Sequence, residues 1–77
     1  MDTLPPETLA DRIRRLRRES SLTTRDLAER MSCNQSTIVD LEAGRGNPTL
    51  RTLDALASAL GTTTALLLNG IRADVAS

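Results

Sequence analysis

Apolar residues recur along this chain at intervals of three and four, the spacing that places side chains on one face of an α-helix. Leu9, Ile13 and Leu16 form the first such stripe and predict a helix over residues 6–20. Further apolar positions predict helices over residues 24–31, 35–43, 50–60 and 64–69. The stripe of the fourth helix is expected to consist of Leu50, Leu53, Leu56, Ala57 and Leu60.

The residues that flank these stripes support the same helices. Pro5 and Pro6 suit the first turn of a helix, and Glu7 suits its positive end. Thr23 and Asp26 have the spacing of a capping box, in which a side chain and a backbone N–H exchange hydrogen bonds at the start of a helix. The other expected N-caps are Asn34, Thr49 and Thr63, and the expected stops are Gly44 and Gly61.

Length and composition agree with a small helical protein. A chain of 77 residues fits one domain, with a core expected over about residues 6–70 and a frayed tail over residues 71–77. Hydrophobic residues make up 39% of the chain and none is aromatic, so the core must consist of Leu, Ile, Val, Ala and Met. Such a core favours packed helices over a β-sandwich.

The charge is zero overall but unevenly distributed. All ten basic residues are Arg, whose planar fork of donors suits phosphate oxygens and guanine edges. Residues 12–30 hold seven Arg and three acids, a local charge of +4, whereas residues 1–11 carry −3 and residues 31–77 carry −1. An anionic partner is therefore possible, but the attraction must come from a local patch.

Several classes of protein are disfavoured. The single Cys cannot form an intrachain disulfide, which fits a reducing cytoplasm, and no signal peptide or membrane-spanning stretch is recognisable. The chain has no His and no clustered carboxylates, so we expect no enzyme, no metal site and no cofactor.

The second and third predicted helices are joined by a turn of about three residues, which is the helix-turn-helix arrangement. In the third helix, Ile38 and Leu41 are expected to pack inward. Its opposite face carries Gln, Ser, Thr and one Asp in place of the Lys and Glu of an ordinary surface helix. Such side chains are suited to exchanging hydrogen bonds with another molecule.

The sequence resembles the phage-repressor family (Cro/C1, or XRE) of helix-turn-helix proteins over about residues 9–70. The resemblance is carried by residues 22–61, LTTRDLAERMSCNQSTIVDLEAGRGNPTLRTLDALASALG. No single motif in it is decisive, but the joint spacing is specific. The resemblance implies an all-α, compact five-helix DNA-binding domain with the helix-turn-helix at its second and third helices, which binds double-stranded DNA as a dimer.

The resemblance also assigns positions that face the major groove. These positions hold Gln35, Ser36, Thr37 and Asp40. Gln pairs with adenine N6 and N7, and hydroxyl groups can hydrogen-bond to several bases. Thr37 contacts either a base or the DNA backbone. A carboxylate can only accept, so Asp40 either favours cytosine N4 or adenine N6, or is a solvated residue at the edge of the contact.

A second set of positions is implied to meet phosphates. It comprises Thr24, Arg25, Arg45, Asn47, Thr49 and Arg51. Thr24 stands where the family usually has Gln, at a helix N-terminus that favours anions. The alternative for both Arg25 and Arg45 is a side chain that is exposed to solvent and contacts no phosphate.

Two further features have structural roles. The family pairs the Glu at position 42 with an Arg of the first helix, which implies a partly buried Arg17–Glu42 ion pair. Ser32 replaces the usual Gly of the turn, at a cost of roughly 1 kcal/mol if the position needs a positive φ. Cys33 replaces a core Val and is expected to be a small buried hydrophobe rather than a redox switch.

The run Leu66-Leu67-Leu68 cannot face one core from a single helical turn, so one or two of these side chains should be exposed. Ile71 or Val75 is expected to extend the patch that results. The family's dimer interface lies in this region, which implies a homodimer through Leu66, Leu68 and Ile71. The alternative is a Leu-rich cap over the fourth helix of a monomer.

Two hypotheses of function follow. The first is a cytoplasmic, nucleoid-associated transcriptional regulator that binds a palindromic operator sequence-specifically as a homodimer. The second is a protein-interaction module of the same fold, such as a coactivator or an antitoxin-type partner-binding protein, which Asp40 and the zero net charge favour.

Overall fold

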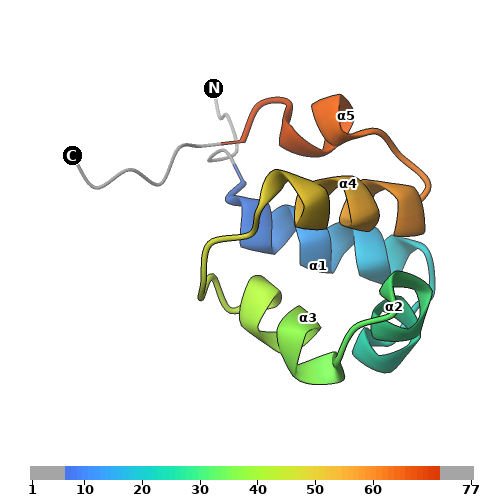
Figure 1. The fold of residues 1–77 in the computed structure, drawn as a ribbon. Helices are drawn as coiled ribbons and strands as arrows, with labels where there is room; N and C mark the ends of the chain where they lie inside the picture. The colour runs from blue at the N-terminus through green and yellow to red at the C-terminus, as the bar shows by residue number, and fades with distance from the viewer. Residues whose placement is uncertain (1–6, 72–77) are drawn as a thin grey trace.

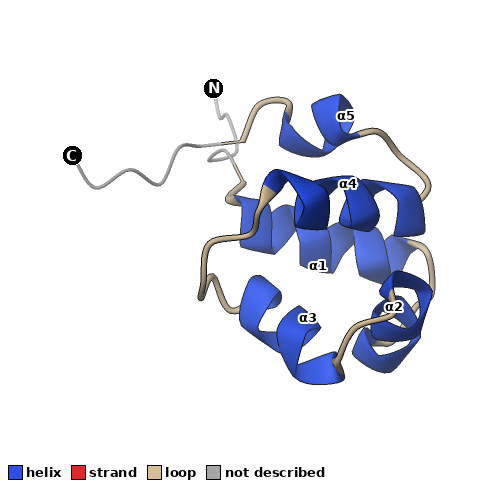
Figure 2. Cartoon of the chain, in the orientation of Figure 1, coloured by secondary structure: helices blue, strands red, loops and turns tan. Residues whose placement is uncertain are grey.

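The computed structural model describes residues 7–71, which form five helices and contain no strand (Figures 1 and 2). The helices are α1 (Leu9–Glu19), α2 (Thr24–Met31), α3 (Gln35–Glu42), α4 (Leu50–Ala59) and α5 (Thr64–Leu68). The all-α architecture with five helices, expected from the apolar spacing, is therefore confirmed.

The helices are arranged with α1 and α4 in the middle, α2 and α3 on one side and α5 on the other (Figure 1). The segment α2–turn–α3 is the helix-turn-helix, and its two helices pack against each other. Helix α1 contacts both α3 and α5, and α4 contacts both α2 and α5. The outer side of α3 is left uncovered, facing away from the rest of the fold (Figure 1).

Each helix contributes one aliphatic side chain that is fully buried. These side chains belong to Ile13, Leu27, Ile38, Leu56 and Leu67. Small residues fill the spaces between them, since Ala28 and Ala57 are also buried and allow close approach of neighbouring helices. Because the five helices share one core, the position of α3 depends on all of them.

The helix starts are defined mainly by threonine. The side chains of Thr8, Thr23, Thr49 and Thr63 each accept a hydrogen bond from the backbone N–H three residues later. Three of these caps were predicted, and Thr8 was not. Asn34 occupies the N-cap position of α3 as predicted, but its side chain makes no capping hydrogen bond.

The predicted start of the first helix at residue 6 is wrong. Helix α1 begins at Leu9, because the Thr8 hydroxyl accepts the N–H of Asp11 and Thr8 itself is extended. Pro5 and Pro6 lie outside the described residues. The other predicted helices start where expected, and their ends differ from the observed ends by no more than one residue.

Leu50 is also misplaced by the prediction. The helical stripe assigned it to the core, yet 66% of its surface is exposed. As the first residue of α4, it precedes the part of the helix that other helices cover. By contrast, Leu56 and Ala57 are buried, and Leu53 and Leu60 pack against the core as expected.

The turn of the helix-turn-helix requires a left-handed residue, which the sequence supplies without a glycine. Ser32 has φ 56° and ψ 43°, and the N–H of Cys33 donates to the carbonyl of Ala28 at 3.0 Å. The predicted cost of a non-glycine residue at this position therefore applies. Cys33 is partly buried against the core, consistent with its expected role as a small hydrophobe.

Candidate nucleic-acid interface

Helix α3 separates into an inner and an outer face. Ile38 and Leu41 are buried, as predicted. The side chains of Gln35, Ser36 and Asp40 are exposed, as is Val39, and Thr37 is partly buried. The residues proposed to read bases therefore lie together on or beside the uncovered side of α3, with Thr37 the least accessible of them.

Gln35 is held by a hydrogen bond that crosses the helix-turn-helix. Its Nε2 donates to the hydroxyl oxygen of Thr24 at 2.8 Å. This bond uses one of the two amide protons and leaves the carbonyl oxygen of Gln35 available. The Thr24 hydroxyl accepts from Gln35, so its own proton is free to be donated elsewhere. The two helices thus present Gln35 and Thr24 as one connected polar surface.

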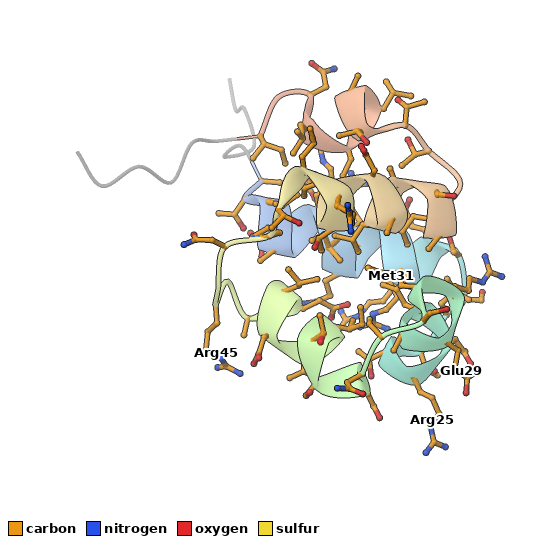
Figure 3. All side chains as sticks on the ribbon, in the orientation of Figure 1. Arg25, Glu29, Met31 and Arg45 are labelled. Carbon is orange, nitrogen blue, oxygen red and sulfur yellow. The ribbon has the colours of Figure 1, made fainter. Side chains whose placement is uncertain are left out.

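The N-terminus of α2 is closed by the predicted capping box. Thr23 N–H donates to Asp26 Oδ2 at 2.9 Å, and Asp26 N–H donates to the Thr23 hydroxyl at 3.0 Å. The hydrogen bond from the Thr23 backbone lowers the pKa of Asp26, so this carboxylate stays ionised. Beside it, Arg25 is exposed and points outward from α2 (Figure 3).

At the other end of α3, Arg45 is paired with Asp40. Arg45 Nε and Nη2 both donate to Asp40 Oδ1, at 3.1 and 2.9 Å, and both side chains are more than half exposed. Gly44, with φ +76°, turns the chain so that the Arg45 N–H also donates to the Asp40 carbonyl at 2.9 Å. The sequence indicated a separate role for Asp40 and for Arg45, but it did not indicate that the two side chains form an ion pair.

The predicted ion pair between Arg17 and Glu42 is present and is the main polar contact of the interior. Arg17 Nε and Nη2 donate to the two carboxylate oxygens of Glu42 at 2.5 and 2.9 Å. Arg17 Nη1 also donates to the carbonyl of Leu22, and the hydrogen bond to Glu42 raises the pKa of Arg17. Glu42 retains only 8% of its exposure, so it contributes to the fold and not to the outer surface.

Two other arginines of α1 satisfy helix ends, which the sequence did not indicate. Arg14 Nη2 donates to the carbonyl of Glu42 at the end of α3, at 2.7 Å. Arg12 Nη1 donates to three carbonyls at the end of α5, those of Leu66, Leu67 and Asn69. Their long side chains thus donate hydrogen bonds to carbonyls at the C-terminal ends of helices that are distant in sequence.

The loop between α3 and α4 and the first turn of α4 contain the remaining proposed phosphate contacts. Asn47 and Arg51 are exposed. Thr49 is exposed too, but its hydroxyl accepts the Thr52 N–H at 3.2 Å and lies 3.0 Å from the Thr52 hydroxyl. Thr49 therefore has a structural task as an N-cap, and an interaction with phosphate would have to share that oxygen.

The leucine run in α5 divides as predicted. Leu67 is fully buried, whereas 60% of Leu66 and 38% of Leu68 remain exposed. Ile71 is partly buried, and Val75 lies outside the described residues. Helix α5 lies across α1 and α4 from α3 (Figure 1), so its exposed leucines do not overlap the polar face of α3.

Two other features are absent from residues 7–71. In this range no three His, Cys, Asp or Glu side chains gather as metal ligands would. Nor does any helix of this range have the length and apolar character needed to cross a membrane.

Comparison with known proteins links this geometry to a family. A family model described as a helix-turn-helix domain matches residues 8–69. The HTH-type transcriptional regulator DdrOP3 of Deinococcus deserti is 43% identical over 63 residues, which cover 82% of this chain and 49% of that protein. The immunity repressor protein of Bacillus phage phi105 is 44% identical over 54 residues, 70% of this chain and 38% of the repressor.

A solved structure with the same fold is the DNA-binding domain of the P22 C2 repressor, which aligns with a TM-score of 0.80 at 24% identity. The alignment covers 87% of this chain and 88% of that domain. At this identity the similarity establishes the fold alone. The chain spans about half, or less, of the length of the two relatives above.

Proposed function

Because the chain belongs to the helix-turn-helix domain family, we propose that it is a sequence-specific DNA-binding transcriptional regulator. It binds a palindromic operator as a homodimer, with α3 of each copy in the major groove. One observation carries this proposal. Two exposed arginines, Arg25 of α2 and Arg45 of the loop after α3, lie on either side of α3 and point in the same direction (Figure 3). This arrangement fits a groove lined on both sides by phosphates.

In this proposal, residues at the start and on the outer face of α3 contact base edges. Gln35 has its carbonyl oxygen and one amide proton available, which is the pair of groups that adenine N6 and N7 require. Ser36 is exposed beside it, and its hydroxyl can donate or accept. Thr37 is less exposed and serves a base or the adjacent backbone.

Phosphate contacts flank these base contacts in the proposed complex. Thr24 lies in the first turn of α2 with a hydroxyl proton to donate, and Arg25 follows it. On the other side are Arg45, Asn47 and Arg51, with Thr49 as a weaker candidate because of its capping role. Contacts of this kind fix the register of the protein on the duplex and make its affinity dependent on salt.

The proposed homodimer uses the exposed leucines of α5. Leu66 and Leu68 are exposed apolar side chains on a small domain and Ile71 is partly exposed, so covering them in an interface would stabilise the fold. A two-fold dimer places equivalent helices about 34 Å apart, one turn of B-DNA. Leu66→Asp should convert the dimer to a monomer in analytical ultracentrifugation, whereas Val39→Asp, which alters an apolar side chain of α3, should leave the dimer intact.

A protein-interaction module is the second candidate, and one observation favours it. Helix α3 carries no basic residue, and Arg45, the nearest arginine of the following loop, is paired with a carboxylate. Binding to a protein partner that is insensitive to salt, without affinity for any duplex, would support this alternative over the regulator.

The test of the proposed function is selection of bound duplexes from a random library, followed by titration of the best duplex and of bulk DNA. We expect one preferred, two-fold symmetric sequence, bound at least about 10³ times more tightly than random DNA at physiological salt. Equal affinity for all duplexes at moderate salt would contradict the proposal.

Two variants separate base contacts from phosphate contacts. Gln35→Ala should relax the preference at one base pair of each half-site, at a cost of roughly 1–3 kcal/mol on the preferred operator. Arg25→Ala should weaken binding to preferred and random duplexes alike, because a phosphate contact carries no base information. Arg18→Ala, which removes one exposed charge of α1, is the matched control.

A further inference from the structure

The geometry of the Asp40–Arg45 pair leaves one recognition group free on each side chain. We propose that the two form a composite recognition unit: Asp40 selects a base that bears an amino group in the major groove, while Arg45 holds a neighbouring phosphate. Each contact depends on the other partner. This inference rests on the proposed function and assigns a specificity-determining residue within it.

The arginine retains its phosphate-binding end. Asp40 Oδ1 accepts hydrogen bonds from Nε and Nη2 of Arg45, which are the donors on one edge of the guanidinium. Within residues 7–71, Nη1 of Arg45 makes no hydrogen bond and Nη2 has a second N–H to donate. Those two donors are parallel, the arrangement that binds a phosphate bidentately. Arg45 can therefore meet DNA without leaving Asp40.

The carboxylate retains an acceptor. Oδ2 of Asp40 has no hydrogen-bond partner among the described residues and lies on an exposed side chain of α3. A carboxylate only accepts, so it selects the amino groups at cytosine N4 or adenine N6 and disfavours the acceptors of guanine and thymine. The selected position is thus a base pair whose amino group faces Asp40.

Arg45 also removes the main objection to a carboxylate at this surface. An isolated Asp on a helix in the major groove would be repelled by phosphates on both sides. A guanidinium 2.9 Å from Asp40 cancels that charge locally. Side chains as exposed as these would be held weakly by an ion pair alone. The hydrogen bond from Arg45 N–H to the Asp40 carbonyl, made possible by the turn at Gly44, keeps the two residues together.

The dependence predicts a reversal of sign in a double-mutant experiment. With Arg45 present, Asp40→Asn should weaken binding to the preferred operator roughly tenfold and abolish selection at one base pair per half-site. With Arg45→Ala as background, the remaining carboxylate is unneutralised, so Asp40→Asn should strengthen binding to all duplexes. The measurements are selection from the random library and titration of the operator with the wild type, both single variants and the double variant.

Glu29→Gln is the control, because it removes one exposed negative charge from α2, on the opposite side of Figure 3 from Arg45. Circular dichroism establishes that every variant is folded. Effects of Asp40→Asn that are equal in both backgrounds overturn the inference, and so does tighter binding to all duplexes when Arg45 is present. If the wild-type protein shows no sequence preference, the proposed function is contradicted as well. If the wild type does show a preference but the effects of the two substitutions are additive, only the inference is contradicted.

Discussion

Two arginine–carboxylate pairs joined by side-chain hydrogen bonds lie at the C-terminal end of α3, and they differ mainly in their surroundings. In the pair of Arg17 and Glu42, side-chain exposure is 12% and 9%, whereas in the pair of Arg45 and Asp40 it is 64% and 54%. Asp40 and Glu42 are only two residues apart, yet they point to opposite faces of the helix. The inner pair joins α1 to α3, and the outer pair is accessible to a ligand.

The contrast shows that burial, and not the type of pair, decides the role. A buried charge that loses its partner is left in a medium that cannot solvate it, so removing either partner of the inner pair destabilises the fold. In the outer pair, water solvates either partner when they separate, so little stability depends on it. An exposed pair can therefore take on a second function at low cost to the fold.

The largest expected effect would come from breaking the inner pair. Glu42→Ala should lower the free energy of unfolding by about 3–5 kcal/mol, because it leaves Arg17 buried without its carboxylate. That is a large share of the roughly 5–15 kcal/mol that stabilises a typical domain. Urea titration followed by far-ultraviolet circular dichroism measures it, since the chain has no aromatic residue to serve as a fluorescent probe.

The same measurement on Asp40→Ala sharpens the comparison. We expect a change of no more than about 1 kcal/mol, because the pair is exposed. Comparable losses for Glu42→Ala and Asp40→Ala would contradict the assignment of the first to the fold and the second to the surface.

A medium-sized effect is expected at the starts of the two helices of the helix-turn-helix, where a similar contrast occurs. Thr23→Ala removes the capping box of α2 and should cost about 1 kcal/mol in urea titration. Asn34→Ala at the start of α3 should cost less, since the Asn34 side chain makes no capping hydrogen bond. A larger loss for Asn34→Ala would show that the side chain caps α3 in solution.

The smallest expected effect is a dependence of stability on acidic pH. It comes from a third carboxylate, Glu7, whose exposure is intermediate between those of the two pairs. Glu7 is 26% exposed and accepts from Arg15 at 2.7 Å and from Arg12 at 3.0 Å. The hydrogen bond from Arg15, followed by that from Arg12, lowers the pKa of Glu7 from 4.5 to about 2. A lowered folded-state pKa stabilises the fold above about pH 4.5, and this contribution is lost as the pH falls towards 2.

Glu7→Gln should therefore be less stable than the wild type near neutral pH, and the difference should shrink as the pH falls from about 4.5 to 2. Thermal melts followed by circular dichroism at a series of pH values would measure this. Glu29→Gln serves as the control for the removal of one exposed carboxylate. A constant difference between Glu7→Gln and the wild type across this range would show that Glu7 is not paired in solution.

Much of the fold was predictable because it depends on local spacing. The apolar intervals located all five helices, and the Thr–x–x–Asp spacing located the start of α2. The start of α1 was predicted too early because Pro5 and Pro6 suit the first turn of a helix. The helix instead begins after Thr8, whose hydroxyl caps it. Leu50 was misplaced because a helical stripe does not reveal where along a helix its neighbours end.

The candidate interface was predictable in part. The resemblance to phage repressors selected the polar residues of α3 and the pair of Arg17 and Glu42, and the structure places these on the outer and inner sides as expected. The hydrogen bond of Gln35 to Thr24 and the pairing of Asp40 with Arg45 were not predicted. Both join residues across a turn, so they depend on turn geometry that residue spacing does not express.

The sequence by itself determined the elements: which segments are helical, which residues begin four of the five helices, and which face of α3 is apolar. These properties follow from intervals of three and four residues and from side chains that bond to their own backbone. The family resemblance supplied the pairing of Glu42 with Arg17, and only the tertiary structure decided that Asp40 is exposed and pairs with Arg45. Those outcomes depend on how α1 and the loop after Gly44 approach α3, which is set by the packing of all five helices around one core.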